Sequence, residues 1–134
     1  MSGRATAVQT GDQLCKVVVA IGQALGLEAR EQFRLGRRIW GAERRIDVIL
    51  TNPHDRRRLG VECKYQGTMG TAEEKVPAIV QDIGAWPIPG LVVFAGEGFS
   101  THMRSFLLGT GKAIHVDDLE SWLRLFFGLE LLGS

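Results

Sequence analysis

The clearest pattern along the chain is an alternation of apolar and polar residues over the segment Arg44–Gln66. A period of two is typical of half-buried strands, and the Asn52-Pro53 pair between the two alternating runs favours a turn. The segment is therefore predicted to be a β-hairpin. Its apolar face would carry Ile46, Val48 and Leu50 from the first arm and Leu59, Val61, Cys63 and Tyr65 from the second.

The polar face of this hairpin carries charges of both signs. If the hairpin is symmetric about the midpoint between positions 54 and 55, residue i lies opposite residue 109 − i, and Asp47 lies opposite Glu62. Directly opposed Cβ atoms are only about 5 Å apart, so two like charges there destabilise a sheet. We therefore expect this pair of acids to hold something cationic. A slip of one residue in the register would place the two acids on opposite faces.

The rest of the chain combines helical periodicity with short apolar runs. An apolar stripe at helical spacing follows Thr10, which fits a capping box with Gln13. The predicted elements, besides the hairpin, are a helix from Thr10 to a stop at Gly26, an irregular strand over 28–40, a helix within 72–86, a strand Leu91–Ala95, a helix Ser100–Leu108, a strand Lys112–Val116 and a helix capped by Asp117. This order predicts an α/β fold, in which helices flank a mixed sheet that begins with a three-strand meander.

Composition indicates one folded domain over residues 1–134, with residues 1–9 as a flexible leader. The 134 residues are 45% apolar and 23% charged, which is typical of globular domains rather than disordered chains. No apolar run approaches the roughly 20 residues that a membrane span needs. The two cysteines, Cys15 and Cys63, lack metal-type spacing and follow no secretory signal, which favours a reducing, cytoplasmic compartment.

Positive charge gathers around the hairpin although the net charge is only +1. Seven arginines fall within 22 residues: Arg37, Arg38, Arg44, Arg45, Arg56, Arg57 and Arg58. Such a cluster suits the phosphate backbone of a nucleic acid. The three arginines of the predicted turn fit a DNA-contacting tip and a solvated loop equally well.

The polar face also carries candidate chemistry. Glu62 and Lys64 lie two residues apart on one predicted strand, so their side chains point the same way, and Asp47 would join them from the neighbouring strand. Two carboxylates side by side suit a hard divalent cation such as Mg²⁺. A metal there would polarise a phosphoryl oxygen and activate a bound water, and Lys64 could orient that water or stabilise the charge of the transition state.

The sequence Glu62-Cys63-Lys64, preceded by Asp47 across a hairpin, resembles the motif of the PD-(D/E)XK nuclease superfamily. The predicted order over roughly residues 10–95 is similar to the αβββαβ core of that restriction-endonuclease-like fold, here with an extra C-terminal strand and helices. The resemblance implies an endonuclease that hydrolyses DNA phosphodiester bonds with Mg²⁺, for which Mn²⁺ can substitute. It also implies that Asp47, Glu62 and the backbone carbonyl of Cys63 bind the metal and that Lys64 is the catalytic lysine.

Other positions extend this motif or depart from it. Gln66 extends it to E-x-K-x-Q, as in several nuclease branches, and would assist catalysis. Nucleic acid would be bound by Gln81, on the second long helix, and by Arg44, Arg45, Arg56, Arg57 and Arg58. Ile46 replaces the name-giving proline. Many branches place an acid on the first helix, where this chain offers Asp12 and Gln13 as candidates.

Several alternatives stay open from the sequence. The same fold could serve as a catalytically idle nucleic-acid-binding or protein-interaction module, and RNA could replace DNA as the partner. The aromatic residues Trp122, Phe126 and Phe127 belong either to the core or to a homodimer surface that includes the apolar tail Leu125–Leu132.

Overall fold

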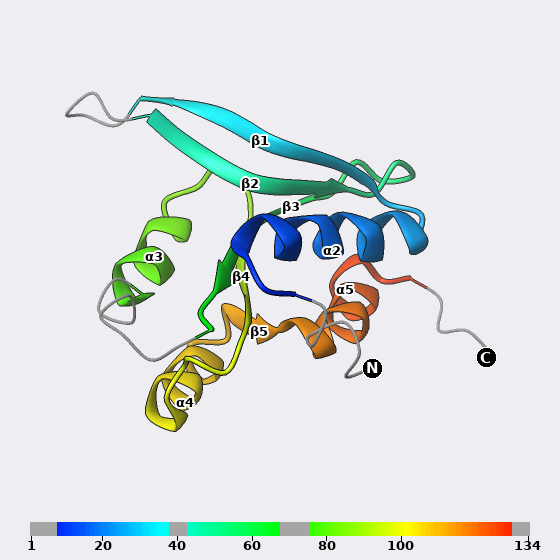
Figure 1. Ribbon diagram of the computed structural model, residues 1–134. Helices are drawn as coiled ribbons and strands as arrows, with labels where there is room; N and C mark the ends of the chain where they lie inside the picture. Colours follow the sequence, from blue (N-terminus) through cyan, green and yellow to red (C-terminus); the bar gives the residue numbers. More distant parts are fainter. Residues whose placement is uncertain (1–7, 38–42, 68–75, 130–134) are drawn as a thin grey trace.

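The computed structural model describes residues 8–37, 43–67 and 76–129 (Figure 1). The helices and strands follow the predicted order: α2 (Gly11–Ala24), β1 (Glu28–Arg37), β2 (Glu43–Thr51), β3 (Arg58–Tyr65), α3 (Val76–Ile83), β4 (Gly90–Ala95), α4 (Thr101–Gly109), β5 (Ala113–His115), the 3-10 helix η2 (Val116–Asp118) and α5 (Leu119–Phe127). Residues 1–7 of the expected leader lie outside the described residues, whereas Val8 is buried in the core.

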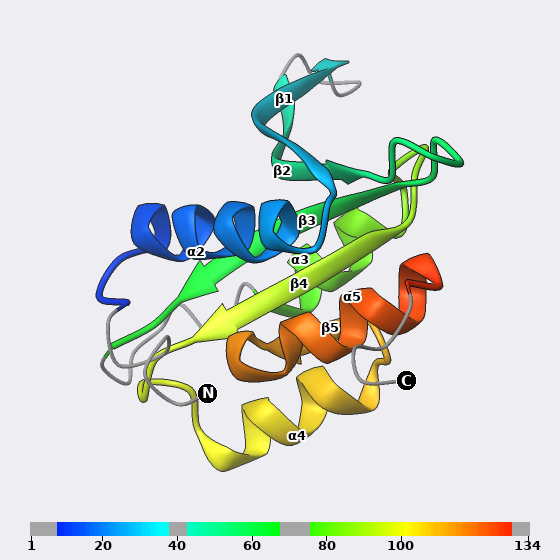
Figure 2. The same ribbon diagram turned by 90° about the vertical axis from the view of Figure 1, so that its right-hand side faces the viewer.

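The five strands form one mixed sheet in the order β1-β2-β3-β4-β5. Strands β1, β2 and β3 form the predicted antiparallel meander, whereas β3, β4 and β5 run parallel to one another. Parallel neighbours need crossover connections, which contain α3 and α4. Helices α2 and α5 pack on one face of the sheet, and α3 and α4 pack on the other (Figure 2). The predicted α/β architecture is confirmed.

The central hairpin has the predicted register. Four residue pairs join β2 to β3, and in each of them the two residue numbers sum to 109: Val48 with Val61, Ile49 with Gly60, Leu50 with Leu59, and Thr51 with Arg58. Towards α2 this hairpin buries Val48, Leu50, Leu59, Val61 and Cys63, as expected from the alternation. The ladder ends at the pair formed by Val48 and Val61, one position before Asp47 and Glu62.

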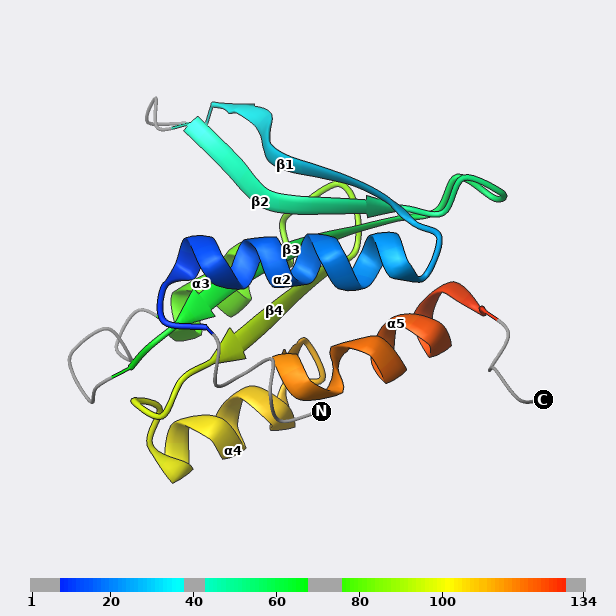
Figure 3. The ribbon, with the colours of Figure 1, turned by 45° about the vertical axis from the view of Figure 1, so that its right-hand side comes forward.

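Strand β2 bends away from β3 beyond this last pair (Figure 3). The alternation predicts that Ile46 shares a face with Val48 and Leu50, but Ile46 packs in the cluster on the opposite face of the sheet. That expectation is wrong because the strand pair is irregular at this point. Gln32 of β1 lies across from Asp47 and has a φ of 57°, a left-handed conformation that interrupts the alternation of a regular strand. Asp47 therefore sits at the bend.

The caps of three helices show how far local signals determine the helix ends. The Thr10 and Ser100 side chains accept hydrogen bonds from first-turn N–H groups, as the sequence predicts for α2 and α4. The expected cap of α5 is wrong. Asp117 belongs to the preceding 3-10 helix, where its N–H donates to Nδ1 of His115, and α5 begins only at Leu119.

Helix α5 places its aromatic residues in or against the core. Phe127 is buried, while the half-buried rings of Trp122 and Phe126 stack with their centroids 5.1 Å apart and pack against the same core. Leu125 points outward and is 78% exposed. The end of the apolar tail, beyond residue 129, lies outside the described residues. Among the helices in the described part of the chain, none is long and apolar enough to cross a bilayer.

Candidate active site

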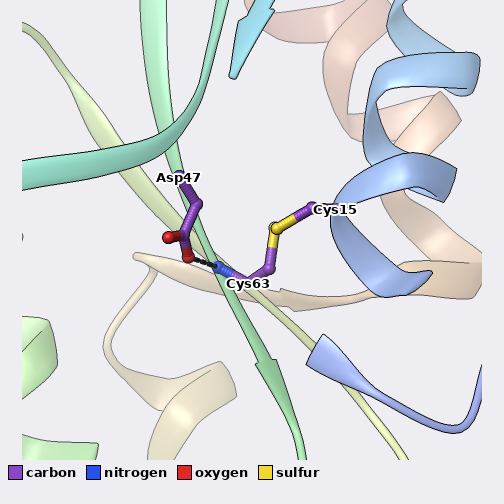
Figure 4. Close-up of side chains that lie close together, drawn as sticks. All are labelled: Cys15, Asp47 and Cys63. Atoms are coloured by element: carbon purple, nitrogen blue, oxygen red, sulfur yellow. Dashed lines mark hydrogen bonds between the residues drawn. The ribbon is translucent and has the colours of Figure 1, made fainter. Parts of the chain in front are cut away.

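Asp47 reaches from the bend of β2 to the backbone of β3. Its Oδ2 accepts a hydrogen bond of 2.9 Å from the N–H of Cys63, as Figure 4 shows. This bond joins the two strands just beyond their last backbone pair, so the carboxylate replaces the ladder at the point where the strands separate. The Asp47 side chain is consequently held beside the Glu62-Cys63-Lys64 segment.

The two predicted acids line one cavity. Asp47 and Glu62 both border a hollow of about 570 Å³, together with Arg45 and with Gln81 and Asp82 of α3. Lys64 lies next to this group, with its Nζ 3.5 Å from Oε2 of Glu62. The structure thus brings Asp47, Glu62 and Lys64 together, as the predicted register requires.

Glu62 is an unusual carboxyl group because it is both shielded from water and surrounded by negative charge. Its side chain is only 19% exposed. Burial, followed by the charge of Asp47, raises the pKa of Glu62 from 4.5 to about 7. Lys64 opposes this increase, and Asp82 adds to it. The ionised form of Glu62 therefore lacks sufficient compensating positive charge from the protein itself.

Asp82 is the acid that sequence reasoning missed. It lies on α3 next to Gln81, lines the Asp47 cavity and is close enough to Glu62 to affect its pKa. A signal for it exists in the sequence, since Asp82 follows Ile79 by three residues and precedes the buried Ile83. A residue so placed on a helix lies beside the inward face.

The candidates on the first helix lie elsewhere. The Oε1 of Gln13 accepts a hydrogen bond from the N–H of Gln9, so this side chain belongs to the capping box. Asp12 lines a separate hollow with Lys16 and Glu31. Neither Asp12 nor Gln13 borders the Asp47 cavity.

Gln66 is likewise held away from the cavity. Its side chain is 8% exposed, and its Nε2 donates a 2.9 Å hydrogen bond to the carbonyl of Gly98 in the loop after β4. Gln66 is not among the residues that line the hollow around Asp47. Its visible role is therefore to join the end of β3 to the following loop.

The side chains of the predicted nucleic-acid-binding arginines lie in different parts of the molecule. Arg45 lines the Asp47 cavity, and its Nη1 donates a 2.6 Å hydrogen bond to Oε1 of Gln32. Arg56 and Arg58 line a second hollow, of about 450 Å³. The guanidinium of Arg57 instead lies over α5, with its carbon 4.8 Å from the ring centroid of Phe126. The side chain of Arg44 lies outside the described residues.

This separation predicts different effects for two neighbouring arginines. Arg57→Ala should lower the free energy of unfolding by about 0.5–1 kcal/mol, because it removes the cation–π contact with Phe126. Arg58→Ala is the matched control, since it removes the same charge from the second hollow. Urea unfolding of both variants measures the difference. The assignment of this contact is wrong if Arg57→Ala unfolds like the wild type, or if Arg58→Ala unfolds more easily than Arg57→Ala.

A second group of donors lies behind the cavity. The Sγ atoms of Cys15 and Cys63 and a carboxylate oxygen of Asp47 all lie within 4.8 Å of one another, close enough to hold a metal ion (Figure 4). Both cysteines are free and buried. The Cys15 thiol and burial raise the pKa of the Cys63 thiol well above its usual range, which keeps the Cys63 thiol neutral. Asp47 therefore lies between a group of oxygen donors and a pair of sulfur donors.

The oxygen donors fit a magnesium ion better than the sulfur donors do. Mg²⁺ prefers carboxylates and water, whereas thiolates favour softer metals. Asp47 and Glu62 offer two carboxylates at one hollow, and burial, followed by the charge of Asp47, raises the pKa of Glu62, so a cation there would stabilise the ionised form. On this chemistry, Asp47 and Glu62 are the residues that would hold a hard divalent cation.

Comparisons with known proteins identify the family and the fold of this chain. A family model described as the PD-(D/E)XK nuclease superfamily domain matches residues 6–124. The fold is similar to the crystal structure of AF1548, a protein of unknown function, with a TM-score of 0.52 and 17% identity over 75% of this chain and 54% of that chain. It is also similar to protein VC1899 from Vibrio cholerae, with a TM-score of 0.50 and 16% identity over 87% of this chain and 33% of that chain.

At 17% and 16% identity, the two structural likenesses show the fold alone. The chain spans only about half of the first protein and a third of the second. No curated protein sequence matches the chain. The family model, in contrast, covers most of the chain and includes the bend with Asp47 and the Glu62-Cys63-Lys64 strand. The chain belongs to the PD-(D/E)XK nuclease superfamily.

Proposed function

We propose that the chain is a Mg²⁺-dependent nuclease that hydrolyses phosphodiester bonds of DNA. The observation that carries this proposal is the placement of Asp47 and Glu62 on one cavity, where burial and the facing charge raise the pKa of Glu62 to about 7. A site that disfavours the ionised carboxyl group gains strongly when a cation enters, because metal binding requires and stabilises that ionised form.

Each residue around the cavity would have its own role in the reaction. When bound, the metal would polarise the scissile phosphate and lower the pKa of a bound water. Asp47 and Glu62 would supply carboxylate oxygens, and the Cys63 carbonyl is proposed as a third ligand. Lys64, close to Glu62, would orient the attacking water or stabilise the negative charge that develops on the phosphate. Mn²⁺ should replace Mg²⁺, because it accepts the same oxygen donors.

The DNA would lie across the sheet face that carries the Asp47 cavity. Arg45 lines that cavity, and the hollow lined by Arg56 and Arg58 also contains Ile49, which belongs to the apolar cluster of the same face. Three arginines along one face would contact successive phosphates. Gln81, at the rim formed by α3, would contact the strand nearest the metal. A homodimer, which would bring two such sites to the two DNA strands, and a cytoplasmic location stay predictions.

Plasmid nicking tests this function. The wild type with Mg²⁺ or Mn²⁺ should nick supercoiled DNA, and a chelator should stop the reaction. Lys64→Ala should reduce the rate by about 100-fold, because it removes the positive charge beside the reacting phosphate. Lys112→Ala is the matched control, since Lys112 is an exposed lysine that lines a different hollow.

Equal nicking by the wild type and Lys64→Ala would show that Lys64 is not catalytic.

The second candidate function is an idle nucleic-acid-binding or protein-interaction module, which is favoured by the absence of an α2 acid from the cavity. Binding of DNA or RNA without cleavage of either, in the presence of Mg²⁺ and of Mn²⁺, would support that module and contradict the nuclease.

A further inference from the structure

We propose that Cys15 and Cys63 are an oxidation site, which forms a reversible disulfide between α2 and β3 and thereby controls cation binding at Asp47 and Glu62. The formation of the disulfide is independent of the proposed function, while its effect on the cation rests on that function. The observation behind the proposal is that the two sulfur atoms and an Asp47 oxygen lie together, within 4.8 Å of one another.

The two thiols face each other across the helix–sheet interface. Cys15 lies on the buried side of α2, and Cys63 lies on the face of β3 that packs against this helix. Their Sγ atoms lie within 4.8 Å of each other. Both belong to one chain and to regular elements, which hold the two sulfur atoms at this distance, so a disulfide bond of about 2.05 Å requires them to approach further.

The two cysteines differ in their access to small reagents. Cys15 lines a surface hollow of about 320 Å³ with Asp12, Lys16 and Glu31. The two cysteines are almost equally buried, at 8% and 6% exposed, but Cys63 borders neither this hollow nor the Asp47 cavity. A hydroperoxide would therefore reach Cys15 first, and Cys63 would act as the resolving thiol.

The reaction with hydrogen peroxide proceeds in two balanced steps. The Cys15 sulfur attacks one peroxide oxygen, the O–O bond breaks, and one water leaves as Cys15 becomes a sulfenic acid. The Cys63 sulfur then attacks the Cys15 sulfur, the S–O bond breaks, and a second water carries away the Cys63 proton. The two thiols lose two electrons in all and the peroxide gains them. A dithiol reductant reverses the change by thiol–disulfide exchange.

The disulfide would alter the candidate active site because Cys63 is part of its framework. The Cys63 N–H donates the hydrogen bond that holds Oδ2 of Asp47, and Cys63 lies between Glu62 and Lys64 in the strand. Drawing its sulfur onto Cys15 would shift this backbone segment towards α2. Displacing the groups that orient a ligand typically weakens metal binding by about 10–100-fold, and we expect a loss of this size on oxidation.

Mass spectrometry tests the disulfide directly. Peroxide treatment of the wild type, followed by proteolysis without reductant, should yield one cross-linked peptide that contains Cys15 and Cys63 and is lighter by two hydrogens. Cys15→Ser and Cys63→Ser should give none. Persistence of both free thiols, or trapping of Cys15 only as sulfinic acid, would overturn the proposal. So would isolation of the protein with one zinc per chain that Cys15→Ser releases, because a metal would then occupy the pair.

Calorimetric titration with Ca²⁺ tests the consequence. The reduced wild type should bind Ca²⁺ at least about tenfold more tightly than the oxidised wild type, and a dithiol should restore the affinity. Peroxide should leave Ca²⁺ binding by Cys15→Ser unchanged, which controls for methionine oxidation. Equal affinity of the two wild-type forms would overturn the control of cation binding. If the reduced protein does not bind Ca²⁺ at all, the proposed function fails at its metal site, while the mass measurement still decides whether the disulfide forms.

Discussion

Glu62→Gln should make the metal-free protein more stable at pH 8 while removing its metal-dependent activity. The pKa of Glu62 is about 7 in the folded chain, against an ordinary value of 4.5. This difference corresponds to roughly 3 kcal/mol, since one pKa unit is worth about 1.4 kcal/mol. The neutral amide avoids the cost of ionising a buried group beside Asp47 and Asp82. We expect a gain of about 1–3 kcal/mol, which allows for partial solvent access.

The pH dependence gives this prediction a definite sign. Below pH 4.5 Glu62 is protonated in both the folded and the unfolded chain and contributes nothing. Between pH 4.5 and about 7 the unfolded chain releases the proton and the folded chain retains it, so Glu62 lowers the free energy of unfolding as the pH rises. The cost is complete above pH 7. Lys64, which is close to Glu62, reduces it but does not remove it.

Urea unfolding of the wild type and Glu62→Gln at pH 4 and pH 8, without metal, measures the effect. The two proteins should differ at pH 8 and converge at pH 4. Glu97→Gln is the control, because Glu97 is an exposed acid in the loop after β4. A Glu62→Gln variant that is less stable than the wild type at pH 8 would show that the environment of Glu62 is misassigned.

Two replacements of Asp47 should separate its structural role from its chemical role. Asp47→Ala removes the acceptor of the Cys63 N–H and should cost about 1–3 kcal/mol of stability, because it leaves a partly buried donor unpaired. Asp47→Asn retains an oxygen for that hydrogen bond and should be at least as stable as the wild type at pH 8, because it also removes the charge that raises the pKa of Glu62. Both variants lack the carboxylate charge, and both should nick DNA at least about 100-fold more slowly.

Nicking rates and urea unfolding on the same preparations measure the two roles. Asp47→Asn is the decisive variant because it is a folded protein without the proposed metal ligand. Substantial cleavage by Asp47→Asn would contradict the role of Asp47 in catalysis. Equal instability of Asp47→Asn and Asp47→Ala would instead contradict the account of the hydrogen bond to Cys63.

The pairing of the hairpin could be predicted because two independent local signals agree on it. The alternation in each arm identifies the faces, and the length of the turn sets which residues meet, so the pairing of Val48 with Val61 follows from the sequence. The same pairing brings Asp47 within one position of Glu62, and the hydrogen bond from the Cys63 N–H then holds Asp47 beside the motif although the ladder has ended. The helix caps at Thr10 and Ser100 are also local, which is why they could be predicted.

Features that depend on distant contacts could not be predicted in this way. The bend at Asp47 lies beside the left-handed backbone of Gln32 in another strand, and Ile46 packs on the opposite face. A period of two does not reveal such a change of phase. Asp82 and Cys15 approach the site from α3 and α2, and their positions depend on how each helix packs on the sheet. Helical periodicity identifies an inward face but not which strand it meets.

Calorimetric titration of the reduced protein with Ca²⁺ is the sharpest test of whether Asp47 and Glu62 together hold one divalent cation. We expect one site per chain, weaker binding below pH 7 as Glu62 takes up a proton, and no measurable binding by Asp47→Asn or Glu62→Gln. An absence of binding by the wild type at pH 8, or an unchanged isotherm for either variant, would contradict this assignment.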